Sequence, residues 1–217
     1  MKTLVIADTH IGDPRCYNNK NIRELIGVRN YDMLVLCGDI VDFWLADMEE
    51  IVQDSLFKLI EKISREKRVV WVIGNHDHDI CKKEYSDILP NVLKTNIFEI
   101  TENNKNILFI HGHQVYRHEN MFWFTKLMAK INTGLFKTFG CDLQRFEQKM
   151  CCYINKIMKV RYKILDKYKN KDIIIMGHTH IVGHVSVSGS ELFDIGSTLF
   201  TKTYAIIENG EVSIRYI

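Results

Sequence analysis

Five short polar clusters in this sequence each follow a run of apolar residues that is typical of a buried β-strand. The clusters are Asp8-Thr9-His10, Gly38-Asp39-Ile40-Val41-Asp42, Gly74-Asn75-His76-Asp77, His111-Gly112-His113 and Gly177-His178-Thr179-His180. The apolar runs are rich in Val, Ile and Leu and show little alternation, as expected for strands buried on both faces. Because ligands in open α/β sheets collect beyond the carboxyl ends of strands, we expect the five clusters to form one site.

The clusters supply carboxylate oxygens, imidazole nitrogens and one amide oxygen, and they contain no cysteine. Such ligands suit two adjacent divalent cations of intermediate softness. A pair of cations can contact both the attacking and the leaving oxygen of a phosphoryl displacement. A single Asp-x-His motif is more often structural than functional, but five clusters in this order predict a metal site.

The apolar runs predict an α/β layered fold with a β-rich C-terminal part. The predicted strands are Thr3–Ala7, Met33–Cys37, Val69–Ile73, Ile97–Thr101, Ile107–Ile110, Ile173–Met176, His184–Val187, Glu191–Asp194, Tyr204–Glu208 and Glu211–Tyr216. Helical patterns at Asn21–Val28 and from about Asp47 to Lys67 separate the first three strands. Asn103-Asn104 and Asn209-Gly210 predict hairpin turns.

A chain of 217 residues suits one compact domain, which we expect to span residues 1–217. Residues 120–170 contain two helix-length stretches broken near Gly134 and Gly140. This segment separates the first four clusters from the last. We therefore predict a helical insertion within the domain that forms a cap over the site.

Charge is distributed unevenly along a chain whose formal net charge is +2. The segment from Val115 to Lys171 holds 13 Lys and Arg residues against 4 Asp and Glu residues. A basic segment on an acidic body predicts an anionic partner or substrate near that segment. A solvated helical face is the commoner explanation of a charge run, and it stays open here.

The cysteines and the N-terminal residues indicate a cytoplasmic protein. The six cysteines include no Cys-x-x-Cys pair, and Cys37 lies within a predicted strand, so we expect reduced and mostly buried thiols. Met1-Lys2 leads directly into the first strand without a signal-peptide pattern. No apolar run approaches the roughly 20 residues that cross a bilayer. Any membrane contact is expected to be peripheral, at the inner face.

The order Asp-x-His, Gly-Asp-x-x-Asp, Gly-Asn-His-Asp, His-Gly-His and Gly-His-x-His resembles the calcineurin-like metallophosphoesterase superfamily over nearly the whole chain. The resemblance implies a β-sandwich flanked by helices and a hydrolase that acts on phosphoric ester or pyrophosphate bonds. It also implies a binuclear centre, with the first metal held by Asp8, His10 and His180, the second by Asn75, His111 and His178, and both by Asp39.

The same resemblance assigns catalytic roles. His76 would protonate the leaving group or steady the phosphate, and Asp77 would set its tautomer. Asp42 would orient a metal-bound histidine. A hydroxide held by the two metals would attack phosphorus. The resemblance favours Mn, although Fe, Zn or Co also suit mixed oxygen and nitrogen ligands. For His76, the alternative to this catalytic role is a structural role in its loop.

Two further segments resemble the UDP-2,3-diacylglucosamine pyrophosphatase branch of that superfamily. They are Gly38-Asp39-Ile40-Val41-Asp42-Phe43-Trp44 and His111-Gly112-His113-Gln114, followed by the basic insertion. That branch acts in lipid A biosynthesis, where it releases UMP from a nucleotide-sugar lipid whose acyl chains a helical cap holds. The resemblance implies hydrolysis of a UDP-diacylglucosamine-like pyrophosphate. Many members of that branch have Arg at the position of His76, so another small phosphoester or nucleotide stays open as the substrate.

The first part of the insertion is apolar and interleaved with lysines, a pattern that suits acyl chains beside phosphate or anionic headgroups. The predicted substrate-binding residues are His113, Trp44, Trp123, Lys126 and Lys130. An amphipathic helix packed on a partner helix at Phe139–Tyr168 explains the same pattern. The expected partners are a small phosphoester or nucleotide-lipid substrate and, through the insertion, a membrane surface.

Two other classes of function are less well supported by the residues. A non-catalytic scaffold on the same fold would lack metal-ligating or catalytic histidines, whereas here all of them are present. A nuclease would spread positive charge along a groove with stacking aromatic residues. Here the excess positive charge is confined to the insertion, which disfavours nucleic acid as a partner.

Overall fold

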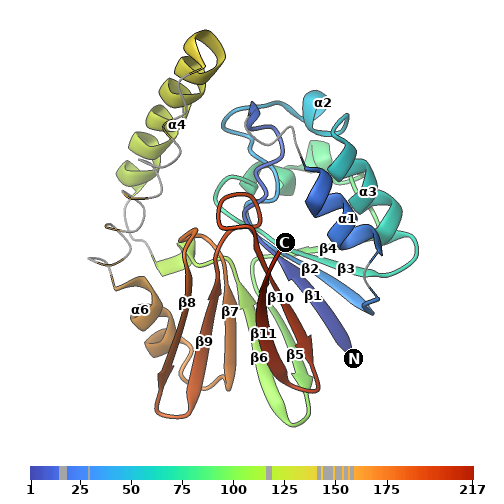
Figure 1. The fold of residues 1–217 in the computed structure, drawn as a ribbon, viewed down its shortest axis with the longest axis vertical. Helices are drawn as coiled ribbons and strands as arrows, with labels where there is room; N and C mark the ends of the chain where they lie inside the picture. Colours follow the sequence, from blue (N-terminus) through green and yellow to red (C-terminus); the bar gives the residue numbers. More distant parts are fainter. Residues whose placement is uncertain are drawn as a thin grey trace.

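The computed structural model describes residues 1–14, 19–28, 30–115, 119–140, 143, 149, 153, 156 and 159–217, and of residues 119–125 it describes the backbone alone. Two β-sheets pack face to face, and helices cover their outer faces (Figure 1). This arrangement confirms the predicted sandwich of sheets flanked by helices. In the part of the chain that the structure describes, no helix is both long and apolar enough to cross a bilayer.

The first sheet has six strands in the order β11-β10-β1-β2-β3-β4. Their bounds are β1 (Lys2–Ile6), β2 (Met33–Cys37), β3 (Arg68–Val72), β4 (Val92–Thr95), β10 (Thr203–Glu208) and β11 (Glu211–Tyr216). Strands β1 to β4 run parallel, and β10 and β11 extend the sheet in antiparallel fashion. The carboxyl ends of β1, β2 and β3 therefore meet at one edge of this sheet.

The second sheet has five strands in the order β5-β6-β7-β9-β8. Their bounds are β5 (Phe98–Glu102), β6 (Lys105–Ile110), β7 (Ile173–Met176), β8 (Val182–Val187) and β9 (Ser190–Ile195). The central strands β6, β7 and β9 run parallel, while β5 and β8 are antiparallel edge strands. Asn103 and Asn104 turn between β5 and β6 with φ angles of 50° and 59°, which confirms the predicted hairpin.

Alternating side chains of the strands face two different cores. Along β1, Leu4 and Ile6 pack against the helices, whereas Val5 packs against the second sheet. Phe109 and Ile175 of the second sheet meet the first sheet in the same core. The central strands are thus buried on both faces, which explains their continuous apolar sequence.

Three helices cover the outer face of the first sheet: α1 (Lys20–Val28), α2 (Met48–Ile51) and α3 (Ser55–Ser64). The single helix predicted from about Asp47 to Lys67 is therefore two. The break occurs because the Asp54 carboxylate accepts the N–H groups of Leu56 and Phe57, at 2.7 and 3.4 Å, and so starts a new helix. Short 3₁₀ helices occupy η2 (His78–Cys81), η3 (Lys83–Tyr85) and η4 (His113–Val115).

Two helices of the predicted insertion are described, and they differ in their surroundings. Helix α4 (Glu119–Phe139) runs through Gly134, where a break was predicted, and ends before Gly140, whose φ is 67°. It rises away from both sheets in Figure 1. Helix α6 (Val160–Lys167) instead packs on the second sheet through Val160, Ile164 and Leu165. Of the predicted helix Phe139–Tyr168, most of the first half lies outside the described residues.

Candidate metal centre

The loops after five parallel strands converge at one edge of the sandwich. Asp8 and His10 follow β1, Asp39 follows β2, and Asn75 follows β3; His111 follows β6, and His178 and His180 follow β7. Backbone hydrogen bonds join neighbouring loops, from the N–H of His10 to the carbonyl of Asp39 at 3.0 Å and from Gly177 to His111 at 3.2 Å. The structure thus brings together all seven residues that the sequence predicted as metal ligands.

Left-handed backbone conformations aim these side chains. Five candidate ligands have a positive φ angle: 52° at Asp8, 47° at His10, 50° at Asp39, 70° at His178 and 55° at His180. A residue other than glycine that is held in this region destabilises the fold by about 1–3 kcal/mol. Such residues cluster at functional sites. Five of them in one group of loops indicate that the fold maintains this geometry against local strain.

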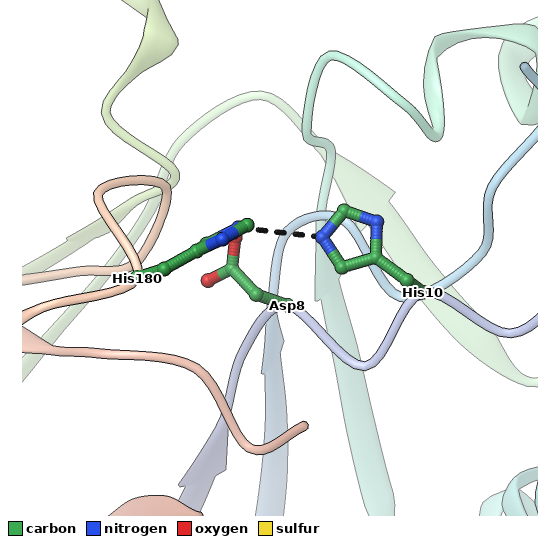
Figure 2. Close-up of side chains that lie close together, drawn as sticks. All are labelled: Asp8, His10 and His180. Atoms are coloured by element: carbon green, nitrogen blue, oxygen red, sulfur yellow. Dashed lines mark hydrogen bonds and ion pairs between the residues drawn. The ribbon is translucent and has the colours of Figure 1, made fainter. Parts of the chain in front are cut away.

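The first candidate ligand group is Asp8, His10 and His180 (Figure 2). The Nε2 atoms of His10 and His180 face each other at 3.4 Å, and Nε2 of His180 lies 3.1 Å from Oδ1 of Asp8. One ligand atom from each residue lies within 4.8 Å of the other two. Two imidazole nitrogens and a carboxylate oxygen that converge in this way form three ligand positions for a divalent cation.

The second candidate group is Asp39, His111 and His178, with the same 4.8 Å limit between ligand atoms. It adjoins the first group, because Nε2 of His111 lies 3.4 Å from both Oδ1 of Asp8 and Oδ2 of Asp39. Asp8, Asp39 and His111 are at most 2% exposed. Two buried carboxylates between two sets of histidines suit a pair of cations.

Asn75 carries an additional sign that the site fits metal. Its side-chain oxygen is buried and has no hydrogen-bond partner. A buried polar atom without a partner destabilises a protein by about 1–3 kcal/mol unless a ligand satisfies it. Since Asn75 follows β3 at the same edge as Asp39, a cation is the ligand that this oxygen and the neighbouring carboxylate would share.

Three glycines permit the close packing of the candidate ligands. A Cβ at Gly74 would lie 2.1 Å from Oδ1 of Asp39, and one at Gly177 would lie 2.4 Å from Oδ2 of Asp8. A Cβ at Gly38 would lie 2.2 Å from Cδ2 of His111. Each separation is too short for a real contact, so the sequence requires glycine beside each of these side chains.

His76 contacts Asp42, not Asp77 as predicted from the sequence. Its Nδ1 atom lies 2.9 Å from Oδ2 of Asp42, which also lies 3.2 Å from Nδ1 of His10. The Asp77 carboxylate is directed elsewhere: it accepts the N–H groups of Val41, Gly74 and the Trp71 indole at 2.9, 2.9 and 3.1 Å. Asp77 therefore holds the loops together, because its oxygens are engaged by these donors.

Buried carboxylates dominate the electrostatics of the site. Burial alone would lower the pKa of His10, but the hydrogen bond to Asp42 and the charges of Asp39 and Asp8 raise it to about 9. Burial alone would lower the pKa of His111 too, but the charge of Asp39 and the hydrogen bond with Asp8 together raise it. Burial and the neighbouring His111 lower the pKa of His178 well below its usual value. The surplus of carboxylates attracts positive charge, which metal ions can supply in place of protons.

The predicted substrate-binding residues divide into two sets. Trp44 stacks on His76 with ring centroids 3.6 Å apart, and Nδ1 of His113 lies 3.1 Å from Nδ1 of His111. Both residues therefore belong to the site. Lys126 and Lys130 are exposed on α4, which lies apart from the converging loops in Figure 1. Trp123 lies on α4 as well, but its side chain is outside the described part of the chain.

Sequence reasoning missed two contacts of the site. Phe200 stacks on His180 with ring centroids 4.8 Å apart, and Thr179 is hydrogen-bonded to the buried carboxylate of Asp194 at 2.5 Å. The signal for Asp194 was its position near the end of a strand, but a lone aspartate there does not reveal its partner. Phe200 gave no signal, because a single aromatic residue in a turn is common.

Comparison with known proteins places this geometry in a family. The family described as calcineurin-like phosphoesterase matches residues 1–182. No match is found among curated proteins. Among solved structures, an archaeal phosphodiesterase is similar at 18% identity and a TM-score of 0.53, with 100% of each chain covered. Vps29 from Chaetomium thermophilum is similar at 13% identity and a TM-score of 0.53, with 100% of this chain and 97% of that chain covered.

A Vps29 mutant from Entamoeba histolytica is similar at 15% identity and a TM-score of 0.50, with 100% and 98% covered. These structures share the fold. The family match spans the loops that carry all seven candidate ligands, from Asp8 to His180. The chain belongs to the calcineurin-like phosphoesterase family and is a hydrolase that acts on phosphoester bonds.

Proposed function

We propose that the chain is a binuclear metal-dependent phosphoesterase that hydrolyses the pyrophosphate of a UDP-diacylglucosamine-like nucleotide-sugar lipid. The observation that carries the binuclear centre is the position of His111, whose Nε2 lies 3.4 Å from carboxylate oxygens of both Asp8 and Asp39. Asp8, His10 and His180 would hold one cation; Asn75, His111 and His178 would hold the other. Asp39 would be shared. We favour Mn, for which these oxygen and nitrogen ligands are suitable.

When bound, the two cations would supply Lewis-acid charge that activates water and stabilises negative charge on the phosphoryl oxygens. The residues of this chain supply positioning and protons. Nδ1 of His76 lies 2.9 Å from Oδ2 of Asp42, and Nε2, on the opposite side of the ring, would donate a proton to the leaving oxygen. Stacking on Trp44 fixes the plane of the His76 ring. His76 thus has the partners of a general acid.

The proposed lipid substrate is supported by the exposed apolar surface of α4. Leu127, Met128 and Ile131 are 40%, 42% and 47% exposed, and Lys126 and Lys130 lie beside them. An apolar surface with flanking lysines suits acyl chains whose headgroups are anionic. The same surface would allow α4 to contact a membrane that contains the substrate.

The test is release of UMP from UDP-2,3-diacylglucosamine by Mn-loaded protein, with Asp39→Ala as the inactive control. We expect turnover by the native chain and none by the control. Hydrolysis of bis(p-nitrophenyl) phosphate is measured in parallel. If only the aryl diester is cleaved, the phosphoesterase stands and the lipid substrate is wrong; the search then moves to nucleotides and other small phosphoesters.

A further inference from the structure

A pocket of about 430 Å³ lies between the start of α6 and the loop that carries His178 and His180. Three of its lining residues are cationic, namely Lys156, Lys159 and Arg161, and three are apolar, namely Val160, Ile181 and Val185. Thr179, which lies between the two histidines in sequence, forms part of the wall. The pocket therefore adjoins the candidate metal centre, with the ligand loop between them.

Within the residues that the structure describes, the positive charge of the pocket is only partly compensated. Arg161 is paired with Asp194, whose Oδ2 lies 2.9 Å from Nε. Lys156 and Lys159 form no ion pair within the described part of the chain, and no acidic side chain is among the described lining residues. Two uncompensated lysines beside a cavity attract an anion.

Arg161 is fixed in place, unlike a typical surface cation. Its Nη2 atom donates to the carbonyl of Ile181 at 2.9 Å. The guanidinium covers Gly183 so closely that a Cβ there would lie 2.3 Å from Cζ. Asp194 also binds Thr179 at 2.5 Å, so the pocket wall and the ligand loop form one hydrogen-bonded unit. Such a wall is already organised before a ligand binds.

The backbone adds to the attraction for anions. Helix α6 begins at Val160, and its N-cap residue Lys159 has a φ of 49° and makes no side-chain cap hydrogen bond. The positive end of the helix dipole therefore adjoins the lysines without a side-chain cap from Lys159. Together with the cavity and its cations, this helix start favours a phosphate oxygen over a neutral group.

We propose that this pocket binds an alkyl phosphate, at a site separate from the candidate metal centre. The lysines and the α6 backbone would contact the phosphate, and Val160, Ile181 and Val185 would contact the first part of the chain. This inference goes beyond the proposed function, because both phosphates of a UDP-diacylglucosamine-like substrate belong to the pyrophosphate at the metals.

The test measures binding of dodecyl phosphate to the full-length chain by calorimetry, after EDTA treatment so that the metal centre does not contribute. Inorganic phosphate is titrated in parallel. We expect dodecyl phosphate to bind more tightly than inorganic phosphate, and the double variant Lys156→Gln/Lys159→Asn to bind it about tenfold more weakly. Asparagine is chosen at position 159 because it tolerates the left-handed backbone.

Lys163→Gln is the matched control, since Lys163 is exposed on the same helix but does not line the pocket. Equal affinity of the native chain and the double variant for dodecyl phosphate, or no binding by the native chain, would overturn the inference. Hydrolysis of bis(p-nitrophenyl) phosphate by the Mn-loaded proteins separates the two proposals. If the native chain does not hydrolyse this diester, the proposed function is contradicted. If the double variant still hydrolyses the diester but binds dodecyl phosphate more weakly, the pocket proposal is supported.

Discussion

The carboxylate of Asp42 lies 2.9 Å from Nδ1 of His76 and thereby joins two loops that follow different strands. The same oxygen lies 3.2 Å from Nδ1 of His10, a candidate metal ligand. Burial alone would raise the pKa of Asp42, but the charge of His76 and the hydrogen bond to His10 hold it below its usual range. One ionised carboxylate therefore positions both a ligand and the proposed general acid.

Replacement of this carboxylate is expected to impair catalysis more than folding. Asp42→Asn should lower kcat by about 10- to 100-fold, because two histidines lose the group that orients them. The measurement is kcat for bis(p-nitrophenyl) phosphate together with Mn²⁺ affinity. In a double-mutant cycle with His76→Gln, the two effects on kcat should be less than additive. Full additivity would show that Asp42 does not act through His76.

Gly74→Ala should displace the Asp39 side chain, because the new Cβ would lie 2.1 Å from Oδ1. The same oxygen accepts the N–H of His76 at 2.8 Å, so the loop cannot adjust without losing that hydrogen bond. A displacement of about 1 Å at such a site can lower the rate roughly 100-fold. The measurements are kcat and Mn²⁺ affinity.

Gly134→Ala is the matched control for that substitution. Gly134 lies in α4, where an added Cβ would meet no described atom within 4 Å apart from its chain neighbours and the backbone of its own helix. Alanine should stabilise the helix by about 0.5–1 kcal/mol, which thermal unfolding measures, and leave kcat unchanged. A similar loss of activity in both variants would contradict the steric explanation.

Metal affinity should increase with pH. In the metal-free protein the pKa of His10 is raised to about 9, so this histidine is protonated at neutral pH and must lose its proton to bind a cation. Mn²⁺ affinity should therefore rise by about tenfold per pH unit below pH 9 for each proton displaced. Calorimetry in buffers of different ionisation enthalpy measures proton release at pH 7. Binding without proton release would contradict His10 as a ligand.

Asp77 is expected to contribute to stability without taking part in catalysis. Asp77→Ala leaves the buried N–H groups of Val41, Gly74 and the Trp71 indole without their acceptor. The free energy of unfolding should fall by about 3 kcal/mol or more, which chemical denaturation measures. Asp77→Asn keeps one acceptor oxygen and should retain kcat near the native value. A large loss of kcat in a folded Asp77→Asn protein would restore the catalytic role predicted from the sequence.

The two helices of the predicted insertion should respond differently to substitution. Leu127→Gln/Ile131→Gln on α4 replaces exposed side chains, so stability should change little while turnover of the lipid substrate and sedimentation with anionic vesicles decrease. Ile164→Ala on α6 empties a position that is 0% exposed and should destabilise the fold by about 2–5 kcal/mol. Unchanged lipid turnover in the α4 variant would show that the exposed apolar surface does not hold substrate.

How far the sequence predicts this structure depends on burial. Met33–Cys37 and Ile173–Met176 were predicted with their observed bounds, because strands buried on both faces give uninterrupted apolar runs. Strand β4 was missed, since Val92–Thr95 is only partly buried at the edge of its sheet and shows no such run. Helices α2 and α3 were predicted as one because the apolar stripe continues past the Asp54 cap.

The candidate ligands were predictable for a related reason. Each follows a strand that the sequence reveals, and parallel strands bring their carboxyl ends together. The partner of His76 was not predictable in the same way. Asp42 and Asp77 both lie near it in the motifs, and only the three donors that engage Asp77 decide between them. Such a choice depends on tertiary packing, which motif order does not encode.

The two sheets contribute different chemistry to the metal centre. The loops of the first sheet supply Asp8, His10, Asp39 and Asn75, whereas those of the second supply three imidazoles, His111, His178 and His180. Neither half holds a complete set of ligands for either cation. Bound metal would therefore act as a non-covalent cross-link between the halves of the sandwich. Removal of the metal would then leave the hydrophobic core as the main contact between the two sheets.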